Sequence, residues 1–235
     1  MGGFEPHSKT QMLEPPTLWE EQTRAKLDQF IDSLYERNKV KNLTRVPREE
    51  AWTRHILDSL AMSELVSPGM NVLDLGTGPG VPGWVLACVY PEIRVVALDS
   101  NKKMVDHMRD LPLPNLEICT DRAEDVARIM EEEFDLVTGR AFAPLGVFLE
   151  TGCRFVKTGG MMAPFRTPND LEEIEAFPAK VLGLALESVL KVDVPDTEVQ
   201  RVFPVYRKLQ RTPQKYPRTW AEIKRAPLTA YHWAN

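Results

Sequence analysis

A glycine-rich stretch, Asp74-Leu75-Gly76-Thr77-Gly78-Pro79-Gly80, closes the short apolar run Asn71–Leu75. Glycine lets the backbone turn sharply and come close to a ligand, because it has no Cβ atom. In open α/β sheets, ligands bind where the carboxyl ends of parallel strands turn into helices. The stretch therefore predicts a strand, a ligand-binding turn and a helix, with a nucleotide or nucleoside as the natural ligand.

The residues after Asn71 alternate between short apolar runs and helical stretches, as in a parallel sheet covered by helices on both faces. Five strands are expected at Asn71–Leu75, Arg94–Leu98, Leu116–Cys119, Phe134–Thr138 and Met161–Phe165. The helices between them are expected to begin near Pro82, Lys102, Ala123 and Ala143. Two later strands, Ser188–Val194 and Val202–Leu209, predict an antiparallel ribbon at the edge of the sheet.

Two amphipathic helices precede the sheet pattern and are expected to cap it. The first follows Thr17, and its apolar residues recur at three- and four-residue spacing: Leu27, Phe30, Ile31, Leu34 and Tyr35. The second is expected to run from Pro47 to about Val66. Residues 1–16 are polar and contain prolines, which predicts a flexible arm. The rest, 17–235, is expected to form one domain with the cap over 17–66.

Composition restricts the class of protein. In 235 residues, 43% are hydrophobic and 27% charged, which is typical of a globular domain. The sequence has no apolar run approaching the roughly 20 residues that span a bilayer, and no signal-peptide pattern. A cytoplasmic monomer without a membrane partner is expected. The three cysteines, Cys88, Cys119 and Cys153, have neither disulfide nor zinc-site spacing, and no metal is expected.

Two acidic residues near the glycine-rich stretch indicate the kind of ligand, which is a nucleoside that carries a positive charge. Asp99 lies 25 residues after Asp74, at the end of the second strand, where a carboxylate accepts hydrogen bonds from ribose hydroxyls. Dinucleotide sites require G-x-G-x-x-G, but this turn reads G-x-G-x-G, which disfavours an NAD-dependent oxidoreductase. Asp74 suits an ammonium or sulfonium better than phosphates. The combination resembles the S-adenosylmethionine motif of class I methyltransferases, which have a doubly wound, Rossmann-like α/β fold.

Further runs occur in a characteristic order along the chain: Asn42-Leu43-Thr44, His55-Ile56-Leu57-Asp58-Ser59-Leu60, Val81-Pro82-Gly83, Asp99-Ser100-Asn101-Lys102-Lys103, Asp121-Arg122-Ala123-Glu124, Gly139-Arg140-Ala141 and Tyr216-Pro217-Arg218. Together they closely resemble the glucose-inhibited division protein B family. Members of that family are bacterial methyltransferases that make 7-methylguanosine in 16S ribosomal RNA. The resemblance extends from about Asn42 to Leu228.

The resemblance implies S-adenosylmethionine as cofactor, with contacts at Gly76, Val81, Ala123, Glu124 and Arg140. Gly78 joins them as part of the glycine turn, and the class implies that Asp99 holds the ribose. The chain departs from the family pattern at Val81, where phenylalanine is usual, and at Pro79. Pro164-Phe165-Arg166 replaces a Leu-Lys-Gly ending of the fifth strand, which puts the role of that lysine in doubt, although Arg166 keeps a positive charge.

The chemistry of guanine N7 agrees with what the sequence lacks. N7 carries a lone pair and no proton, so its methylation needs orientation of the reactants and no general base. The Asn/Asp-Pro-Pro-aromatic run used on exocyclic amines is replaced by Thr138-Gly139-Arg140-Ala141, and no cysteine has the setting of a nucleophile. His55 and Asp58 lie three apart on one helix, as an orienting pair or an ordinary helix contact. No catalytic residue is assigned.

Charge is distributed unevenly. The net charge is −5, but residues 201–235 contain eight Lys/Arg and one acid, Glu222, which gives +7 and leaves −12 for the rest. The segment predicts contacts with 16S ribosomal RNA or the small ribosomal subunit through Arg207, Lys208, Arg211, Lys215 and Arg218. On charge alone, a solvated face is equally compatible. Arg37–Arg54 is also basic, and Trp52 and Tyr216 offer possible stacking faces.

Three functions remain open from the sequence. The first is methylation of guanine N7 in small-subunit ribosomal RNA. The second is methyl transfer from S-adenosylmethionine to a small molecule or a protein. The third is a ribosome-assembly or RNA-binding protein that retains the cofactor fold without turnover.

Overall fold

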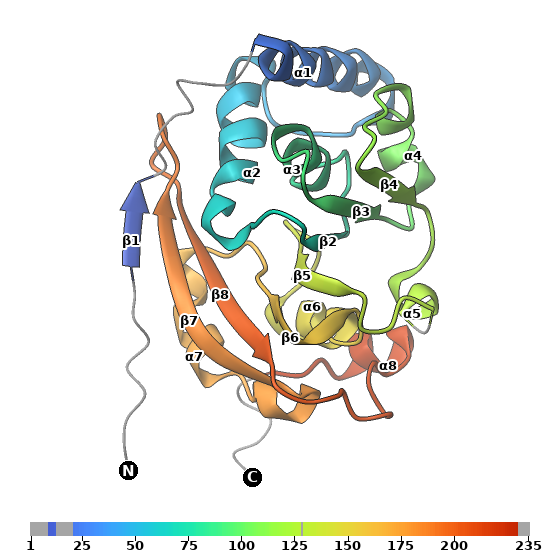
Figure 1. Cartoon of the computed structure of the whole chain (residues 1–235), viewed down its shortest axis with the longest axis vertical. Helices are drawn as coiled ribbons and strands as arrows, with labels where there is room; N and C mark the ends of the chain where they lie inside the picture. The colour runs from blue at the N-terminus through green and yellow to red at the C-terminus, as the bar shows by residue number, and fades with distance from the viewer. Residues whose placement is uncertain (1–8, 13–20, 128, 230–235) are drawn as a thin grey trace.

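The computed structural model describes residues 9–12, 21–127 and 129–229, and its centre is an eight-stranded sheet (Figure 1). The strands lie in the order β1-β7-β8-β6-β5-β2-β3-β4. Their bounds are β1 Lys9–Met12, β2 Asn71–Leu75, β3 Arg94–Leu98, β4 Leu116–Cys119, β5 Phe134–Thr138, β6 Val156–Met162, β7 Leu184–Asp193 and β8 Gln200–Lys208. The pairs from β4 through β3, β2 and β5 to β6 are parallel, which confirms the predicted α/β class.

The antiparallel strand does not lie at the edge of the sheet as predicted. β8 runs antiparallel to both β6 and β7 and lies between them. β1 pairs in parallel with the outer side of β7, where Lys9 is opposite Leu190, and therefore takes the edge position (Figure 1). The expectation of a loose arm over residues 1–16 thus fails at Lys9–Met12, because these residues complete the sheet; residues 1–8 and 13–16 lie outside the described residues.

The first four predicted strands have the observed bounds, and the later three differ. The fifth was placed at Met161–Phe165, but β6 begins at Val156, because Lys157 and the pair Gly159-Gly160 interrupt the apolar pattern without ending the pairing. Backbone hydrogen bonds continue beyond the strand, from Ala163 N to Val137 O and from Phe165 N to Gly139 O. β7 begins earlier than the predicted Ser188, and β8 spans Gln200–Lys208 rather than Val202–Leu209.

Helices cover both faces of the sheet, and the alternation of side chains along each strand explains why. Val72 packs on one face with residues of α1 and α3, whereas its neighbour Leu73 packs on the other with residues of α6. The helices between the strands are α3 Gly83–Val89, α4 Lys102–Val105, α5 Ala123–Val126 and α6 Leu145–Gly152. Helices α7 Leu171–Ala176 and α8 Trp220–Arg225 follow β6 and β8. Each face therefore has its own apolar core.

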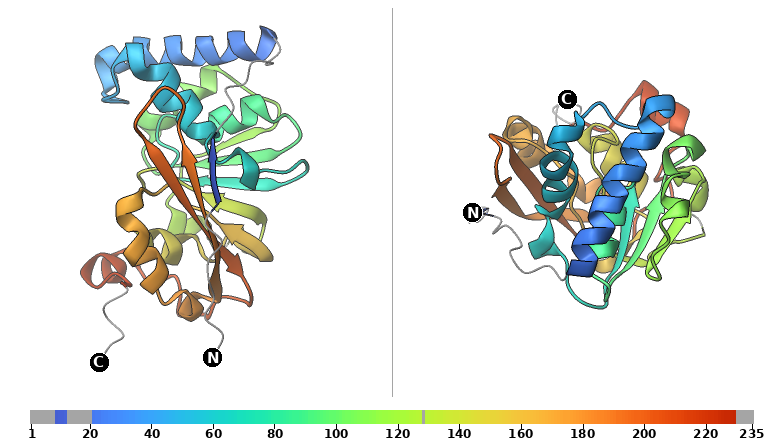
Figure 2. Two further views of the ribbon diagram at one scale, coloured as in Figure 1. Left: turned by 90° about the vertical axis from the view of Figure 1, so that its left-hand side faces the viewer. Right: turned by 90° about the horizontal axis from the view of Figure 1, so that it is seen from above.

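The predicted cap is present, but its second helix is not continuous. Helix α1, Glu21–Lys41, buries Leu27, Phe30, Ile31 and Leu34, and lies across the molecule in Figure 2. Its Phe30 ring stacks on Trp84 of α3 at 4.5 Å. The second helix consists of the 3₁₀ turn Arg48–Glu50, the π-helical turn Trp52–Leu57, α2 Asp58–Leu60 and the 3₁₀ turn Ser63–Leu65. π-Helical turns are frequent at functional sites, and this one carries His55.

No helix in the described ranges has the length and apolar character needed to cross a membrane.

Candidate functional site

A cleft of about 860 Å³, here called the cofactor cleft, opens at the carboxyl ends of β2, β3, β4 and β5. It is closed on one side by residues of the cap, including Thr44, His55 and Asp58, and on another by Arg166 and Arg201. All the residues predicted for the cofactor line it, namely Gly76, Gly78, Val81, Asp99, Ala123, Glu124 and Arg140. The fold thus gathers at one opening residues from four separate loops, and cofactor contact by each stays a prediction.

The glycine turn presents its backbone to the cofactor cleft. Gly76, Gly78 and Gly80 have φ angles of 75°, 54° and 100°, which side chains rarely adopt. The amides of Gly76 and Thr77 both donate to the Leu98 carbonyl, at 2.8 and 3.0 Å, which ties the turn to the end of β3. A Cβ atom at Gly78 would contact only the methyl of Met104, at 3.6 Å. The open space in front of Gly78 can therefore receive a ligand.

Asp99 supports this turn and faces the cofactor cleft. Its Oδ2 accepts the Gly78 amide at 2.9 Å, and its Oδ1 accepts the Asn101 amide at 2.8 Å. A carboxylate offers about four acceptor positions, so two remain for a ligand. The geometry is compatible with the predicted ribose contact.

Asp74 plays a different part from the one expected of a cation partner. Its side chain is completely buried behind the turn and is not part of the cleft wall. Oδ2 accepts the Gly83 amide at 2.7 Å. Burial raises the pKa of Asp74 to about 6. The carboxylate therefore joins the end of β2 to the start of α3 and holds the glycine turn from behind.

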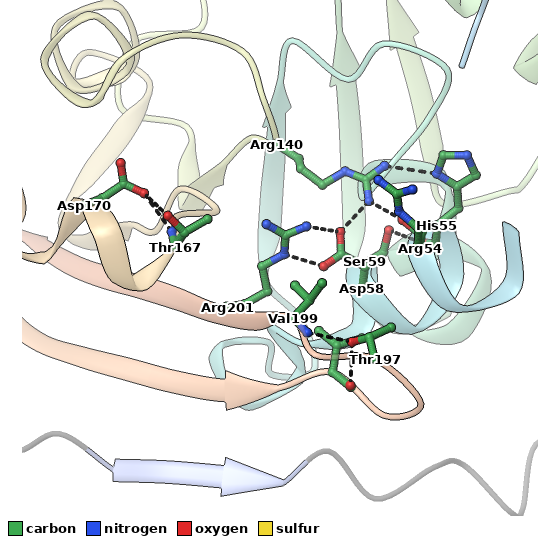
Figure 3. Close-up of polar contacts among 11 residues, drawn as sticks. Arg54, His55, Asp58, Ser59, Arg140, Thr167, Asp170, Thr197, Val199 and Arg201 are labelled. Atoms are coloured by element: carbon green, nitrogen blue, oxygen red, sulfur yellow. Dashed lines mark hydrogen bonds and ion pairs between the residues drawn. The ribbon is translucent and has the colours of Figure 1, made fainter. Parts of the chain in front are cut away.

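Arg140, at the end of β5, reaches the cap through a shared carboxylate (Figure 3). Its Nη1 donates to Asp58 Oδ2 at 2.6 Å and to the Arg54 carbonyl at 2.8 Å. Arg201 of β8 donates to the same carboxylate, from Nε to Oδ1 at 2.5 Å and from Nη2 to Oδ2 at 2.9 Å. Since the Asp58 side chain is only 3% exposed, two strands and the cap are joined at one buried charge.

His55 lies between this network and the cleft. Arg140 Nη2 is 3.2 Å from His55 Nδ1, and His55 Nε2 is 3.0 Å from the Thr44 hydroxyl. Burial, with a further contribution from the Arg140 charge, lowers the pKa of His55 to about 4, so the ring is neutral at physiological pH. The residue pairing predicted from helix spacing alone, His55 with Asp58, is in the structure indirect and passes through Arg140.

Comparison with known proteins decides the family. The family model for rRNA small subunit methyltransferase G matches residues 23–200. The chain belongs to this family. Ribosomal RNA small subunit methyltransferase G of Mesoplasma florum is 35% identical over 210 residues, which cover 86% of this chain and 89% of the relative. The protein of that name from Lachnoclostridium phytofermentans is 34% identical over 210 residues, with coverage of 85% and 87%. The predicted family is thus confirmed.

A solved structure supports the fold independently. A TehB-like SAM-dependent methyltransferase from Corynebacterium glutamicum superposes with a TM-score of 0.52 at 20% identity, over 75% of this chain and 98% of that chain. At this identity the likeness speaks for the fold only. It confirms the predicted class I methyltransferase architecture.

The five residues predicted to bind RNA differ in how exposed they are in this member of the methyltransferase G family. None of Arg207, Lys208, Arg211, Lys215 and Arg218 lines the cofactor cleft. Lys208 is 1% exposed, and its ammonium donates to the Cys153 carbonyl and the Thr212 hydroxyl. The prediction for Lys208 is therefore wrong, because its charge is enclosed in the core and cannot meet a phosphate. Arg211 and Lys215 are exposed.

All three arginines of that set are paired with acids, and the exposed Arg211 has its Nη2 3.4 Å from Glu131 Oε1. Arg207 donates to the Glu187 carboxylate through Nε and Nη2, and to the Gly159 carbonyl. Arg218 forms two hydrogen bonds to the buried Glu150 carboxylate, at 2.7 and 2.6 Å. Tyr216, expected as a stacking face, is 4% exposed and belongs to the core. Arg207, Tyr216 and Arg218 thus all make contacts within the protein.

Several residues of the site had no distinguishing signal in the sequence. Arg201 was one of eight basic residues in its segment, and only the packing of β8 beside the cap places it on Asp58. Arg166 was noted for its charge alone; it lines the cleft and donates to the Phe165 and Ala143 carbonyls, both at 3.1 Å. Its Nε is buried without an acceptor, and no ion pair to it occurs in the part of the chain that the structure describes. Trp220 also lines the cleft.

Proposed function

We propose that this protein transfers a methyl group from S-adenosylmethionine to N7 of a guanine in small-subunit ribosomal RNA. The observation that carries the proposal is the composition of the cofactor cleft. One wall is a nucleoside-binding turn with a free carboxylate face, and the opposite wall is a fixed, neutral His55 between Thr44 and Arg140. That combination can orient two ligands, and its imidazole is not free to remove a proton, because both ring nitrogens are already hydrogen-bonded.

The cleft fits the cofactor residue by residue. The two unused acceptor positions of Asp99 suit the ribose hydroxyls, and the open backbone at Gly78 suits the part of the cofactor that passes over the turn. Ala123 and Glu124, at the start of α5, suit the adenine edge through a backbone amide and a carboxylate. When bound, S-adenosylmethionine supplies a methyl group on a sulfonium, which a ring nitrogen lone pair accepts without losing a proton.

The residues of the protein act by positioning. His55 cannot serve as a mobile base, because Arg140 occupies Nδ1 and the Thr44 hydroxyl occupies Nε2. Holding nucleophile and electrophile in line contributes up to about 7 to 11 kcal/mol in favourable intramolecular cases. The cap, joined to β5 and β8 through Asp58, provides the rigid wall that such positioning needs.

A mechanism with a covalent cysteine is disfavoured by the same structure. None of the three cysteines lines the cofactor cleft. Burial raises the pKa of Cys88, Cys119 and Cys153 to about 11, so the thiolate is scarce at neutral pH. In the described residues, no group of three or more His, Cys, Asp or Glu is arranged to hold a metal ion.

The RNA is proposed to lie over cationic groups that the protein leaves available. Arg45, beside the cleft residue Thr44, is exposed and has no ion-pair partner among the described residues. Arg166 offers a guanidinium inside the cleft, and Lys215 offers an exposed charge further away. Arg207, Arg211 and Arg218 stay in the proposal only as secondary contacts, since each already has a carboxylate partner. We place the reaction in the cytoplasm and assign it to a monomer.

The test is methyl transfer with labelled S-adenosylmethionine and small-subunit RNA from cells that lack the gene. The RNA is offered naked and within the assembled small subunit, and a protein extract and a small-molecule extract serve as competing substrates. Label in RNA supports the proposal, and the comparison of naked RNA with the particle identifies the substrate form. Label only in the small-molecule or protein fraction refutes it. Cofactor binding without any transfer favours the non-catalytic RNA-binding function instead.

A further inference from the structure

A second cleft, of about 840 Å³, adjoins the cofactor cleft, and the function proposed above assigns no ligand to it. Its charged lining includes Arg122, Arg154 and Arg218, with Glu124 and Asp125 as the acids. Arg122, Glu124 and Trp220 line both clefts. The two openings are therefore adjacent parts of one surface, separated by this short wall, and a chain molecule bound in one can continue into the other.

Trp220 differs from the other tryptophans that the structure describes. Trp84 is 2% exposed and donates from Nε1 to the Leu111 carbonyl, and the Trp52 ring is covered by the Arg24 guanidinium at 3.7 Å. Trp220 is half-buried and belongs to neither apolar core. Within the described residues its Nε1 has no hydrogen-bond partner, and no aromatic or cationic group covers its ring. Part of a large aromatic surface thus faces the two openings.

The segment that carries this indole is held in place. The Arg218 guanidinium is bound by the buried Glu150, and the Tyr216 carbonyl accepts from Arg154 Nε at 2.5 Å. Thr219 and Glu222 form a reciprocal capping box at the start of α8, with Glu222 Oε2 accepting the Thr219 amide at 2.9 Å. Trp220 is the first residue of that helix. Its position is fixed before any ligand binds, which lowers the entropic cost of stacking.

The charge around the second cleft is suited to a polyanion. Arg122 is 64% exposed and lies 3.5 Å from its nearest acid, Glu124, so its charge is only weakly neutralised. Lys215, Lys224 and Arg225 are exposed on the same segment as Trp220. An exposed aromatic ring beside weakly paired cations is the arrangement by which proteins bind single-stranded nucleic acid.

We infer that the second cleft is a nucleotide subsite. It holds a nucleotide that flanks the target guanosine in the same single-stranded RNA. The base of that nucleotide stacks on Trp220, and a phosphate lies beside Arg122. The inference rests on the proposed function, because it takes the RNA as the substrate of the adjoining cleft. It adds that the enzyme reads more than the methylated nucleotide, and that this contact lies at the wall shared by the two clefts.

Tryptophan fluorescence tests the subsite without requiring turnover. The probes are a single-stranded RNA pentanucleotide with a central guanosine, guanosine monophosphate and S-adenosylhomocysteine. The pentanucleotide is expected to quench the wild-type protein and the control Trp52→Phe, and to leave Trp220→Phe unquenched. Trp220→Ala is expected to bind the pentanucleotide about 10-fold more weakly, which Trp220→Phe largely restores. Guanosine monophosphate is expected to bind Trp220→Ala and Trp220→Phe with equal affinity, since it does not reach the second cleft.

The results separate this inference from the proposed function. Quenching through Trp220 by the pentanucleotide, in a protein that fails to methylate RNA, supports the subsite and refutes the proposed reaction. Methylation of RNA with unchanged KM in a folded Trp220→Ala supports the reaction and refutes the subsite. Quenching by S-adenosylhomocysteine and not by RNA also refutes it, because the ring then covers the cofactor. Equal melting temperatures and equal cofactor affinity of the variants exclude misfolding as the cause.

Discussion

Arg140 Nη2 lies 3.2 Å from His55 Nδ1, and this contact fixes the tautomer of the imidazole. A guanidinium has only donors, so Nδ1 must be the acceptor and the proton of the neutral ring must be on Nε2. Nε2 then donates to the Thr44 hydroxyl, which also accepts the Val46 amide. Both lone pairs of that hydroxyl are occupied, and its own hydrogen is free to be donated to an acceptor in the cleft.

The Thr44 hydroxyl is therefore expected to donate to the substrate, for which guanine O6, next to N7, is the suitable acceptor. Replacing it in Thr44→Val should lower kcat/KM for RNA methylation about 10-fold, the effect of about 1 to 1.5 kcal/mol for one hydrogen bond. Thr44→Ser should retain most of the activity. Steady-state kinetics with RNA as the varied substrate provide the measurement. Equal activity of the Val and Ser variants contradicts the assignment.

Asp58 is expected to be the most sensitive position of the network. Asp58→Asn keeps the shape but removes the charge shared by Arg140 and Arg201, and should lower the free energy of unfolding by about 3 kcal/mol. Asp28→Asn, which breaks the exposed pair with Arg24, is the matched control and should change it by less than about 0.5 kcal/mol. Urea unfolding of both variants measures the difference. Similar small effects at both positions contradict a structural role for Asp58.

Gly78 and Gly69 provide a matched pair for the cofactor site. Both have positive φ, 54° and 82°, and neither meets a close backbone neighbour when a Cβ is added. Each alanine variant should lose about 1 to 2 kcal/mol of stability from the backbone conformation. Only Gly78→Ala places a methyl group in the cofactor cleft, and it should weaken S-adenosylmethionine binding by at least about 10-fold in calorimetric titration. Unchanged affinity in Gly78→Ala would falsify the placement of the cofactor over the turn.

Lys208 and Lys215 are expected to respond in opposite ways to truncation. Lys208→Ala removes two hydrogen bonds from a buried ammonium and should cost about 3 kcal/mol of stability, with little change in RNA affinity of the folded protein. Lys215→Ala should leave stability within about 0.5 kcal/mol. It should also reduce the slope of log affinity against log salt by about 0.7 for single-stranded RNA. Filter binding across salt concentrations decides, and a reversed pattern is incompatible with the structure.

Stability should fall as the pH is lowered from 7.5 to 5. Burial lowers the pKa of His55 and of His107 from 6.5 to about 4, so each ring is neutral in the folded protein and takes up a proton on unfolding. Each ring therefore lowers the free energy of unfolding by about 2 kcal/mol over this range. Asp74 acts in the opposite direction, because burial raises its pKa to about 6. Its protonation in the folded protein increases the free energy of unfolding by about 1 kcal/mol over the same range. The expected net loss is about 2 to 3 kcal/mol.

Urea titrations at the two pH values test this balance. His107→Phe, which keeps an aromatic ring against Phe30, should reduce the loss to about 1 kcal/mol. The same pH dependence in the variant and the wild type would show that His107 is not the source.

The sheet and the cofactor end of the site were predictable because their signals are local. The apolar runs of β2 to β5 are continuous, and the glycine turn and Asp99 follow at fixed distances from strand ends. The predicted bounds of the later strands were less accurate. Glycines and a charged residue interrupt the apolar pattern of β6, and the ends of a strand depend on its pairing with neighbouring strands, which the sequence pattern does not show. The strand Lys9–Met12 had no signal, since three polar residues followed by one methionine become a strand only beside β7.

The substrate end of the site depends on contacts between distant segments, which spacing does not reveal. Asp58 and Arg201 are 143 positions apart, yet form two hydrogen bonds, and the basic segment that contains Arg201 divides into buried, paired and exposed members. Net charge could not separate Lys208, enclosed in the core, from Lys215 at the surface. A position-specific account of RNA binding therefore required the tertiary structure.

Nucleoside analysis of RNA methylated by the purified protein is the most direct test of the central claim. Small-subunit RNA that lacks the modification is incubated with labelled S-adenosylmethionine, digested to nucleosides and separated by mass-resolved chromatography. The account predicts that the label appears in 7-methylguanosine and is absent when Gly78→Ala replaces the wild-type protein at low cofactor concentration. Label in a methylated exocyclic amine, a ribose or a pyrimidine carbon, and none in 7-methylguanosine, would contradict it.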